Sequence, residues 1–212
     1  MRRNEPRRLS SRPTGPRGRI CVTGGEMVSA QDVISIYQRL LDNGIQVWLS
    51  GGWGIDALLG EQTRPHKDLD VIILLDDVVR MRELLGRDGY GLKELWSENR
   101  WVVDAHGVEA ATAFVLQDSE GREFDAHAMR LDDRGNGIPA WEAEGFIFKK
   151  QDLAGEGMIA GLAVQCLTPE MQVLCHTGYE LPDKQLRDLE LLHEKFGVEY
   201  PDEHSRLRST GA

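Results

Sequence analysis

The sequence predicts an α+β protein, in which a sheet with flanking helices is followed by a C-terminal helical part. Apolar residues recur at helical spacing over 33–41, strand-like apolar runs dominate 90–131, and helical spacing returns after residue 168. With 212 residues, 41% of them hydrophobic, the chain can bury the core of one domain. We therefore divide it into a leader (1–26), a core (27–140), a C-terminal helical subdomain (141–200) and a tail (201–212).

The first half of the core alternates helices with short strands. Ser29 and Asp32 have the spacing of a capping box, and Asn43-Gly44 ends the helical pattern that follows them. A short apolar run indicates a buried strand, and glycine clusters indicate turns. In order, we expect a helix after Ser29, a strand at 47–49, a glycine turn at 51–54, a helix at 55–59, a strand headed by Asp68 and Asp70, and a helix at 77–85.

The second half of the core is predicted to consist of strands, and its clearest part is a hairpin. Two apolar runs, 113–116 and 123–131, flank the turn at 118–121. Because side chains alternate between the two faces of a strand, Asp125 and His127 share one face of the second run. The hairpin therefore supplies a third carboxylate, from a different strand than the acidic pair upstream.

The C-terminal region is predicted to be a loop at 132–145 and helical thereafter. Thr168 and Pro169 are typical of a helix start, and this helix is expected to run to about Tyr179. Asp183 is the expected cap of a last helix, whose apolar stripe ends at a glycine.

Composition and charge limit the function. The net charge is −10, and because residues 1–26 contain seven arginines and two glutamates, the remaining chain carries −15. A body this acidic repels nucleic-acid backbones and suits a cationic small molecule, so no nucleic-acid partner is expected. The three cysteines have no paired metal-ligand spacing, and no apolar run approaches the roughly 20 residues of a membrane span. We expect a cytoplasmic protein without membrane contact.

The basic leader lacks the apolar segment of a secretory signal. We interpret it as a disordered tail, or as residues translated from a start site upstream of Met27, which opens the first helical segment. The sequence leaves open an organelle transit peptide and a basic arm that touches nucleic acid.

The chemistry of the chain centres on Asp68 and Asp70. Residues two apart on a strand point the same way, about 6.6 Å apart between Cα atoms, so these carboxylates can share a divalent cation. Mg²⁺ prefers oxygen ligands and substrate phosphates, and Asp125 could be a third ligand or accept the proton of an attacking hydroxyl. Carboxylates at a strand start are, however, often merely solvated.

The glycine cluster upstream is a candidate phosphate site. Gly51 and Gly52 would let backbone N–H groups approach a phosphate, although tight turns need glycine in any protein. The spacing matches neither a Walker motif nor a dinucleotide fingerprint.

The residues from Trp48 to Asp70 resemble the antibiotic nucleotidyltransferases of the polymerase-beta superfamily, the lincosamide nucleotidyltransferases most of all and the aminoglycoside adenylyltransferases next. The resemblance covers most of residues 29–196. It rests on Gly-Gly-Trp-Gly-Ile-Asp at 51–56, Thr63-Arg64, His66, Asp68-Leu69-Asp70, Phe124-Asp125-Ala126-His127, His176-Thr177-Gly178-Tyr179, Asp183-Lys184 and Asp188.

The resemblance implies a polymerase-beta-like nucleotidyltransferase fold with a mixed sheet flanked by helices. It also implies that Asp68 and Asp70 are Mg²⁺ ligands, and that Asp125 is the third ligand or the general base. Gly51 and Gly52 would bind the triphosphate. A nucleoside monophosphate would move from a nucleotide such as ATP to a hydroxyl group, with release of pyrophosphate.

One departure from the superfamily concerns the glycine pair. The glycine-serine turn of the superfamily is glycine-glycine here, so residue 52 has no hydroxyl to hold a phosphate oxygen. Ser50, which precedes the pair, is a candidate replacement.

Other polar residues have two interpretations each. Arg64 and His66 could contact phosphate, or could form structural hydrogen bonds within their loop. Lys184 could reach the β- and γ-phosphates, or could be a solvated lysine in the first turn of a helix. His127 is interpreted as a hydrogen-bonded core residue, and most tryptophans as core packing.

The sequence therefore predicts a Mg²⁺-dependent nucleotidyltransferase that binds a nucleoside triphosphate and a small hydroxylated acceptor, with a lincosamide or an aminoglycoside antibiotic as candidate acceptor. Two alternatives stay open: modification of a protein hydroxyl or an RNA end, and a nucleotide-binding module that has lost activity. The sequence also leaves open whether the chain forms a homodimer.

Overall fold

The computed structural model describes residues 26–177 and 180–199. The predictions for the tail, for the leader up to residue 25 and for the helix end near Tyr179 concern residues outside these ranges.

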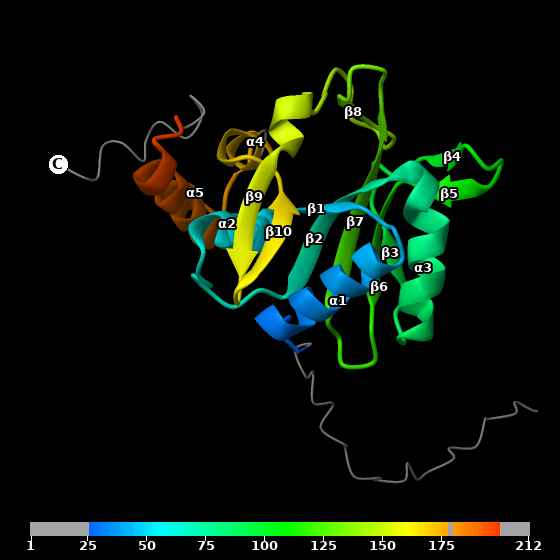
Figure 1. Ribbon diagram of the computed structural model, residues 1–212, viewed down its shortest axis with the longest axis horizontal. Helices are drawn as coiled ribbons and strands as arrows, with labels where there is room; N and C mark the ends of the chain where they lie inside the picture. Colours follow the sequence, from blue (N-terminus) through cyan, green and yellow to red (C-terminus); the bar gives the residue numbers. More distant parts are fainter. Residues whose placement is uncertain (1–25, 178–179, 200–212) are drawn as a thin grey trace, which may run out of the picture.

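A mixed sheet forms the centre of the molecule. Its strands are β1 (Val47–Ser50), β2 (Asp68–Leu74), β3 (Gly91–Leu95), β6 (Ala113–Gln117), β7 (Glu123–Leu131), β8 (Gly137–Pro139), β9 (Gly155–Ile159) and β10 (Leu162–Cys166). They pair in the order β3-β6-β7-β2-β1-β10-β9, with β8 beside β7 (Figure 1). Because β2 is parallel to β7 but antiparallel to β1, the sheet contains both pairing types. The predicted α+β class with a mixed sheet is confirmed.

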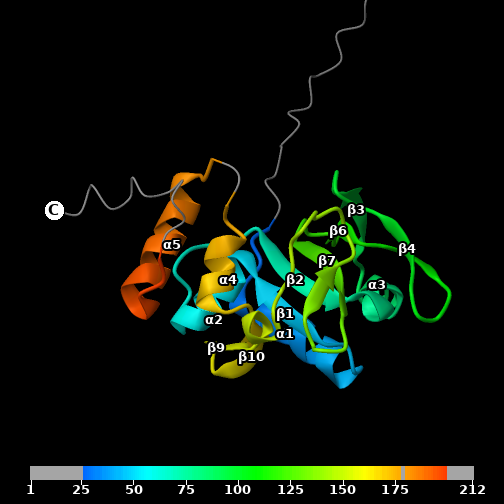
Figure 2. The same ribbon diagram turned by 90° about the horizontal axis from the view of Figure 1, so that it is seen from above.

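Helices pack around this sheet. They are α1 (Ala30–Asp42), α2 (Gly51–Leu59), α3 (Val78–Arg87), α4 (Pro169–Leu174) and α5 (Asp183–Phe196), with short 3-10 turns η1 (Leu75–Asp77) and η2 (Lys150–Leu153). Seen from above, α4 and α5 lie together at one end of the molecule and α3 at the other (Figure 2). The capping box of α1 is confirmed, because Asp32 accepts a hydrogen bond from the Ser29 backbone N–H at 2.8 Å while its own N–H donates to Ser29 Oγ.

The pairing register separates apolar from acidic side chains. Leu49, Val71 and Ala126 occupy facing positions on β1, β2 and β7 and belong to the main hydrophobic core. Side chains one residue along each strand point to the opposite face, where Asp70 faces Asp125 across the β2–β7 pair. The predicted division of the hairpin strand into an apolar and a polar face is thus confirmed.

Helix α2 begins at Gly51, whereas the sequence predicts a turn at 51–54 and a helix only from Ile55. The low helix propensity of glycine favours a turn, but α2 packs against β1, β2 and β9, and this packing outweighs the local preference. The result matters for the site, because the first turn of the helix directly follows the end of β1.

Strands also occur where the sequence predicts none. β8 lies in the predicted loop 132–145, and the β9–β10 hairpin lies in 141–200, where only helices are predicted. Gly155 and Gly157 weaken the strand pattern of β9, yet a Cβ atom at Gly157 would lie 2.4 Å from the backbone of Ala57, so only glycine fits against α2. The parallel pairing of β10 with β1 joins segments far apart in sequence, which local periodicity does not reveal.

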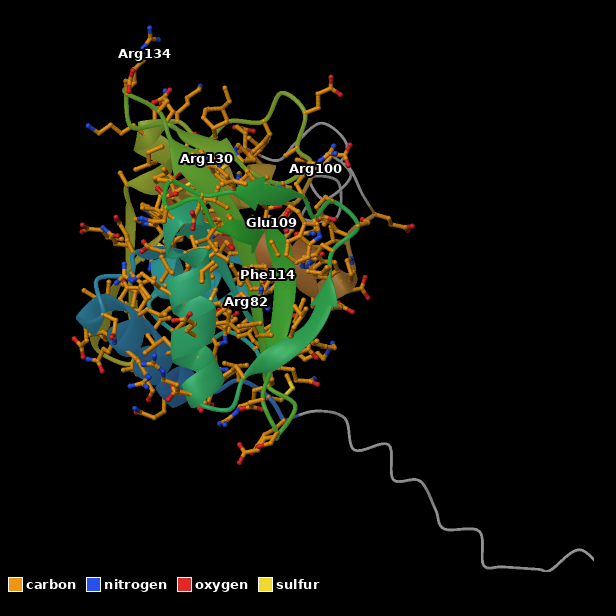
Figure 3. The ribbon with its side chains drawn as sticks, turned by 90° about the vertical axis from the view of Figure 1, so that its right-hand side faces the viewer. Arg82, Arg100, Glu109, Phe114, Arg130 and Arg134 are labelled. Carbon is orange, nitrogen blue, oxygen red and sulfur yellow. The ribbon has the colours of Figure 1, made fainter. Side chains whose placement is uncertain are left out.

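The side of α3 carries a small separate ribbon of β4 (Trp101–Val103) and β5 (Glu109–Ala111). Arg130 of β7 donates to the carbonyl oxygen of Val103 at 2.8 Å and ties the ribbon to the main sheet. On the same side Arg82 of α3 lies over the ring of Phe114, 5.5 Å from its centroid (Figure 3). Among the described residues, none of the helices combines the length and apolarity that crossing a membrane requires.

Two glycine substitutions test the packing of β9 against α2. Gly157→Ala should lower the free energy of unfolding by roughly 1–3 kcal/mol, because the added Cβ meets the α2 backbone. Gly86→Ala, in open space on α3, should raise it by roughly 0.5–1 kcal/mol. Urea denaturation measures both. Equal effects of the two substitutions would contradict the close approach.

Candidate active site

Three polar side chains lie in a row across three neighbouring strands. Ser50 at the end of β1 is paired with Asp70 on β2, and Asp70 is paired with Asp125 on β7. Paired residues project to the same face, and Asp68, two residues before Asp70, projects there too. The structure therefore brings the three carboxylates to one face of the sheet, as the sequence predicts.

The N-terminus of α2 adjoins this row. Gly51 has φ +57°, and a Cβ atom there would lie 2.2 Å from Asp70 Oδ2, so the close approach requires glycine. Ser50 is the N-cap residue but makes no capping hydrogen bond with its side chain. Backbone N–H groups of the first turn have no partner within a helix, and together with the helix dipole they favour an anion.

A pocket of about 530 Å³ opens over the row. Its lining includes most of the predicted site residues, namely Ser50, Gly51, Gly52, Arg64, Asp68, Asp70 and Lys184. His127 and an apolar wall of Ile72, Trp141, Phe146, Phe148 and Leu174 also line it. Asp125 and His66 are not among the lining residues, and both are buried.

Desolvation and neighbouring charge raise the pKa of two of these carboxylates. Burial raises the pKa of Asp70 well above its ordinary value, and the charges of Asp68 and Asp125 raise it further, against a lowering by Arg64. Burial also raises the pKa of Asp125 to about 6, while His127 and a hydrogen bond from Trp96 oppose the increase. The site therefore holds negative charge that its own residues leave incompletely neutralised.

Asp125 is held by its neighbours. Trp96 Nε1 donates to Asp125 Oδ1 at 2.8 Å, and His127 Nδ1 lies 3.5 Å from the same oxygen. The other ring nitrogen of His127 lies 3.2 Å from Glu98 Oε1. Its ring packs between Trp96 and Trp141. His127 is thus a hydrogen-bonded residue at the pocket edge, and Trp96 has a polar role that the sequence analysis does not assign.

Asp56 organises the loop that leads into β2. Its Oδ1 accepts from the backbone N–H and the hydroxyl of Thr63 at 3.2 and 2.6 Å, and its Oδ2 lies 2.5 Å from His66 Nε2. Asp56 and His66 are both only 2% exposed. His66 therefore has the structural contact that the sequence leaves as its alternative role, and no place in the pocket lining.

Arg64 has a buried partner on the C-terminal helix. Its Nη2 lies 2.6 Å from Asp188 Oδ2, and its Nε is 3.1 Å from both carboxylate oxygens. Asp188 is 2% exposed, whereas the Arg64 side chain is 20% exposed and lines the pocket. Sequence reasoning gave Asp188 and Asp56 no role, because their partners lie in other segments.

The glycine at residue 52 also has a structural explanation. A Cβ atom there would lie 2.2 Å from His66 Nδ1 and 3.0 Å from Arg64 Nη2. The ring and the guanidinium occupy the space that a serine side chain would need. This local packing explains why glycine, and not serine, occupies residue 52.

The donor set fits a hard divalent cation that also has ligands outside the protein. In the part of the chain that the structure describes, no three His, Cys, Asp or Glu side chains are grouped closely enough to hold an ion by themselves. Mg²⁺ commonly uses only one or two carboxylates, with water and substrate phosphates completing its octahedron. Asp68 and Asp70, which lie beside the helix N-terminus, satisfy that requirement.

Comparison with known proteins finds similarity to two kinds of antibiotic resistance protein. The sequence profile of aminoglycoside-2''-adenylyltransferases matches residues 32–192. A lincosamide resistance protein of Staphylococcus haemolyticus is 27% identical over 148 residues, which are 70% of this chain and 84% of that protein.

Solved structures show the same fold. The lincomycin-bound lincosamide antibiotic adenylyltransferase LnuA is 25% identical with a TM-score of 0.66, over 79% of this chain and 98% of that one. ANT(2'')-Ia in complex with adenylyl-2''-tobramycin is 18% identical with a TM-score of 0.59, over 84% of this chain and 94% of that one.

The perturbed carboxylates predict an unusual pH dependence of stability. The pKa of Asp125 rises from 3.8 in the unfolded chain to about 6 in the fold, so the fold binds more protons between these values. The contribution of Asp125 to the free energy of unfolding is therefore fully present below pH 3.8 and is lost as the pH rises through 6. Asp125→Asn lacks this titrating group, so it should not lose this stability as the pH rises. With a chelator present, the difference in free energy of unfolding, variant minus native protein, should therefore increase by on the order of 3 kcal/mol from pH 3.5 to pH 8. Denaturant titrations across this range measure the difference, and a constant difference would contradict the electrostatic account.

Proposed function

The chain belongs to the aminoglycoside-2''-adenylyltransferase family of nucleotidyltransferases, and we propose that it transfers a nucleoside monophosphate from a triphosphate such as ATP to a hydroxyl of a lincosamide or an aminoglycoside. One observation carries the proposal. Asp68, Asp70 and Asp125 share one face of the sheet, beside the N-terminus of α2 and under a pocket large enough for a small molecule.

The triphosphate binds at the α2 end of the pocket. Backbone N–H groups of Gly51 and Gly52 face the phosphates, and Ser50 offers a hydroxyl that does not cap the helix. Arg64 and Lys184 add two cations to the lining and stabilise the charge that develops on the leaving pyrophosphate. His66 acts through its packing beneath Gly52, without contacting the nucleotide.

Asp68 and Asp70 are the residues that would hold Mg²⁺, with Asp125 as a further ligand or as the general base. When bound, the ion neutralises the triphosphate and orients the attacking and leaving oxygens. Asp70 is only partly exposed at the pocket wall, and desolvation disfavours its bare charge, so a bound cation would stabilise this carboxylate.

The transfer requires a proton acceptor near the acceptor hydroxyl. The hydroxyl oxygen forms a bond to the α-phosphorus, the bond from that phosphorus to the bridging oxygen breaks, and pyrophosphate leaves with the electron pair. With a pKa of about 6, Asp125 is deprotonated at neutral pH and still basic enough to take the hydroxyl proton. Trp96 fixes one oxygen of this carboxylate and leaves the other for the reaction.

The acceptor occupies the remaining part of the pocket. The aromatic side chains of Trp141, Phe146 and Phe148 offer an apolar surface, and Glu144 in the same wall offers a negative charge for an amine. The excess of acidic residues over the whole chain also favours a cationic acceptor over a nucleic acid. We place this reaction in the cytoplasm, where ATP and Mg²⁺ are supplied.

A direct assay tests the function. Purified protein, MgCl₂ and ATP or GTP labelled at the α-phosphate are incubated with lincomycin or tobramycin, and labelled product is separated from nucleotide. We expect a labelled antibiotic, loss of product with chelator, and recovery with added Mg²⁺. Asp68→Asn should lower the rate at least about a hundredfold, because the carboxylate pair is broken.

The matched control is Asp132→Asn, an acid-to-amide change in the exposed turn after β7, which should keep the full rate. Product formed equally well by Asp68→Asn would contradict the metal mechanism. Absence of product with every acceptor of both antibiotic classes would contradict the proposed substrates.

A further inference from the structure

A buried ion pair joins the C-terminal helix to the wall of the pocket. Asp188 of α5 contacts Arg64 through both carboxylate oxygens, and the two residues are 124 positions apart in the chain. The Asp188 side chain is 2% exposed, so its charge is stabilised mainly by the Arg64 guanidinium and hardly by water. Removing one partner of such a pair leaves the other charge buried and unpaired.

The pair fixes the orientation of Arg64. A guanidinium is a planar fork, and Asp188 binds the edge formed by Nε and Nη2. Nη1 makes one long contact, 3.4 Å from the carbonyl oxygen of Pro65. Because Arg64 lines the pocket next to Gly52, the edge that Asp188 does not bind is the one available to an oxyanion there.

The same helix brings a second cation to the site. Lys184 precedes Asp188 by one helical turn on α5, and residues four apart lie on the same face of a helix. Lys184 and Gln185 both line the pocket. The residue that binds Arg64 and the second pocket cation therefore belong to one face of one helix.

We propose that Asp188 is a positioning residue for the nucleotide, which aligns Arg64 and docks α5 so that Lys184 faces the triphosphate. The inference deepens the proposed function and rests on its nucleotide site. It assigns to the C-terminal helix a role in phosphate binding, beyond closing the hydrophobic core with Leu189 and Leu192.

The affinity for a nucleotide analogue tests the positioning role of Asp188, and the acceptor need not be known. The probe is the non-hydrolysable analogue α,β-methylene ATP with MgCl₂, titrated into the full chain in a calorimeter. Asp188→Asn keeps the size of the side chain but removes its charge, and we expect a dissociation constant about tenfold higher. Leu192→Val, which loosens the same helix in the core, should lower the melting temperature but leave the dissociation constant within twofold.

Arg64→Lys gives an independent test, should Asp188→Asn fail to fold. Lysine keeps the positive charge and the attraction to Asp188 but lacks the second edge of the fork, so nucleotide binding should weaken to a similar extent. Where Asp188→Asn does fold, the double variant should bind no more than about threefold more weakly than Arg64→Lys alone, because both changes disrupt one unit. Additive losses would contradict positioning through Arg64.

Kinetics separate positioning from a general loss of structure. In Asp188→Asn the KM for the nucleotide should rise about tenfold, while the KM for the antibiotic stays within twofold. Unchanged nucleotide binding in Asp188→Asn, or in Arg64→Lys where Asp188→Asn does not fold, would overturn the inference, and so would an equal rise in both KM values. A protein that binds the analogue as expected but modifies no antibiotic would contradict only the proposed acceptors.

Discussion

Repulsion between closely placed carboxylates is the constraint on which the rest of the site depends. Asp70 has a raised pKa because it is partly desolvated and lies beside the charges of Asp68 and Asp125 on one face of the sheet. Neutral residues at these positions would make the fold more stable, so the presence of all three acids indicates a positively charged ligand. The adjacent N-terminus of α2 calls for a negatively charged one. A metal-bound triphosphate satisfies both demands at once, and a metal or a phosphate alone satisfies only one of them.

A network of buried polar contacts holds this arrangement in place. Asp56 binds Thr63 and His66, and the His66 ring lies directly under Gly52. Arg64, from the same loop, reaches Asp188 on the C-terminal helix. The sequence motif thus has two physical roles: some of its residues face the pocket, and others hold the glycine turn and the entry to β2 in position. In the proposed reaction, only residues of the first kind would contact the reacting groups.

The sequence predicts the local features well, because they follow from local chemistry. The α1 cap, the two faces of the hairpin strand and the acidic pair on β2 are all confirmed. The start of α2, the β9–β10 hairpin and the partners of Arg64 and Trp96 are not predicted, because they depend on contacts between distant segments. His66 shows the same limit: the sequence left phosphate contact and a structural hydrogen bond as alternatives, and its burial against Asp56 could be seen only in three dimensions.

The central claim is that Asp68 and Asp70 meet a divalent cation on the sheet face that also carries Asp125. Crystals grown with Mn²⁺ and α,β-methylene ATP test it most directly, since anomalous scattering locates the ion independently of the refined side chains. The account predicts a peak within about 2.3 Å of carboxylate oxygens of Asp68 and Asp70, bridged to the analogue's phosphates. An ion bound elsewhere, or an analogue bound in the pocket with these carboxylates turned away from its metal, would contradict it.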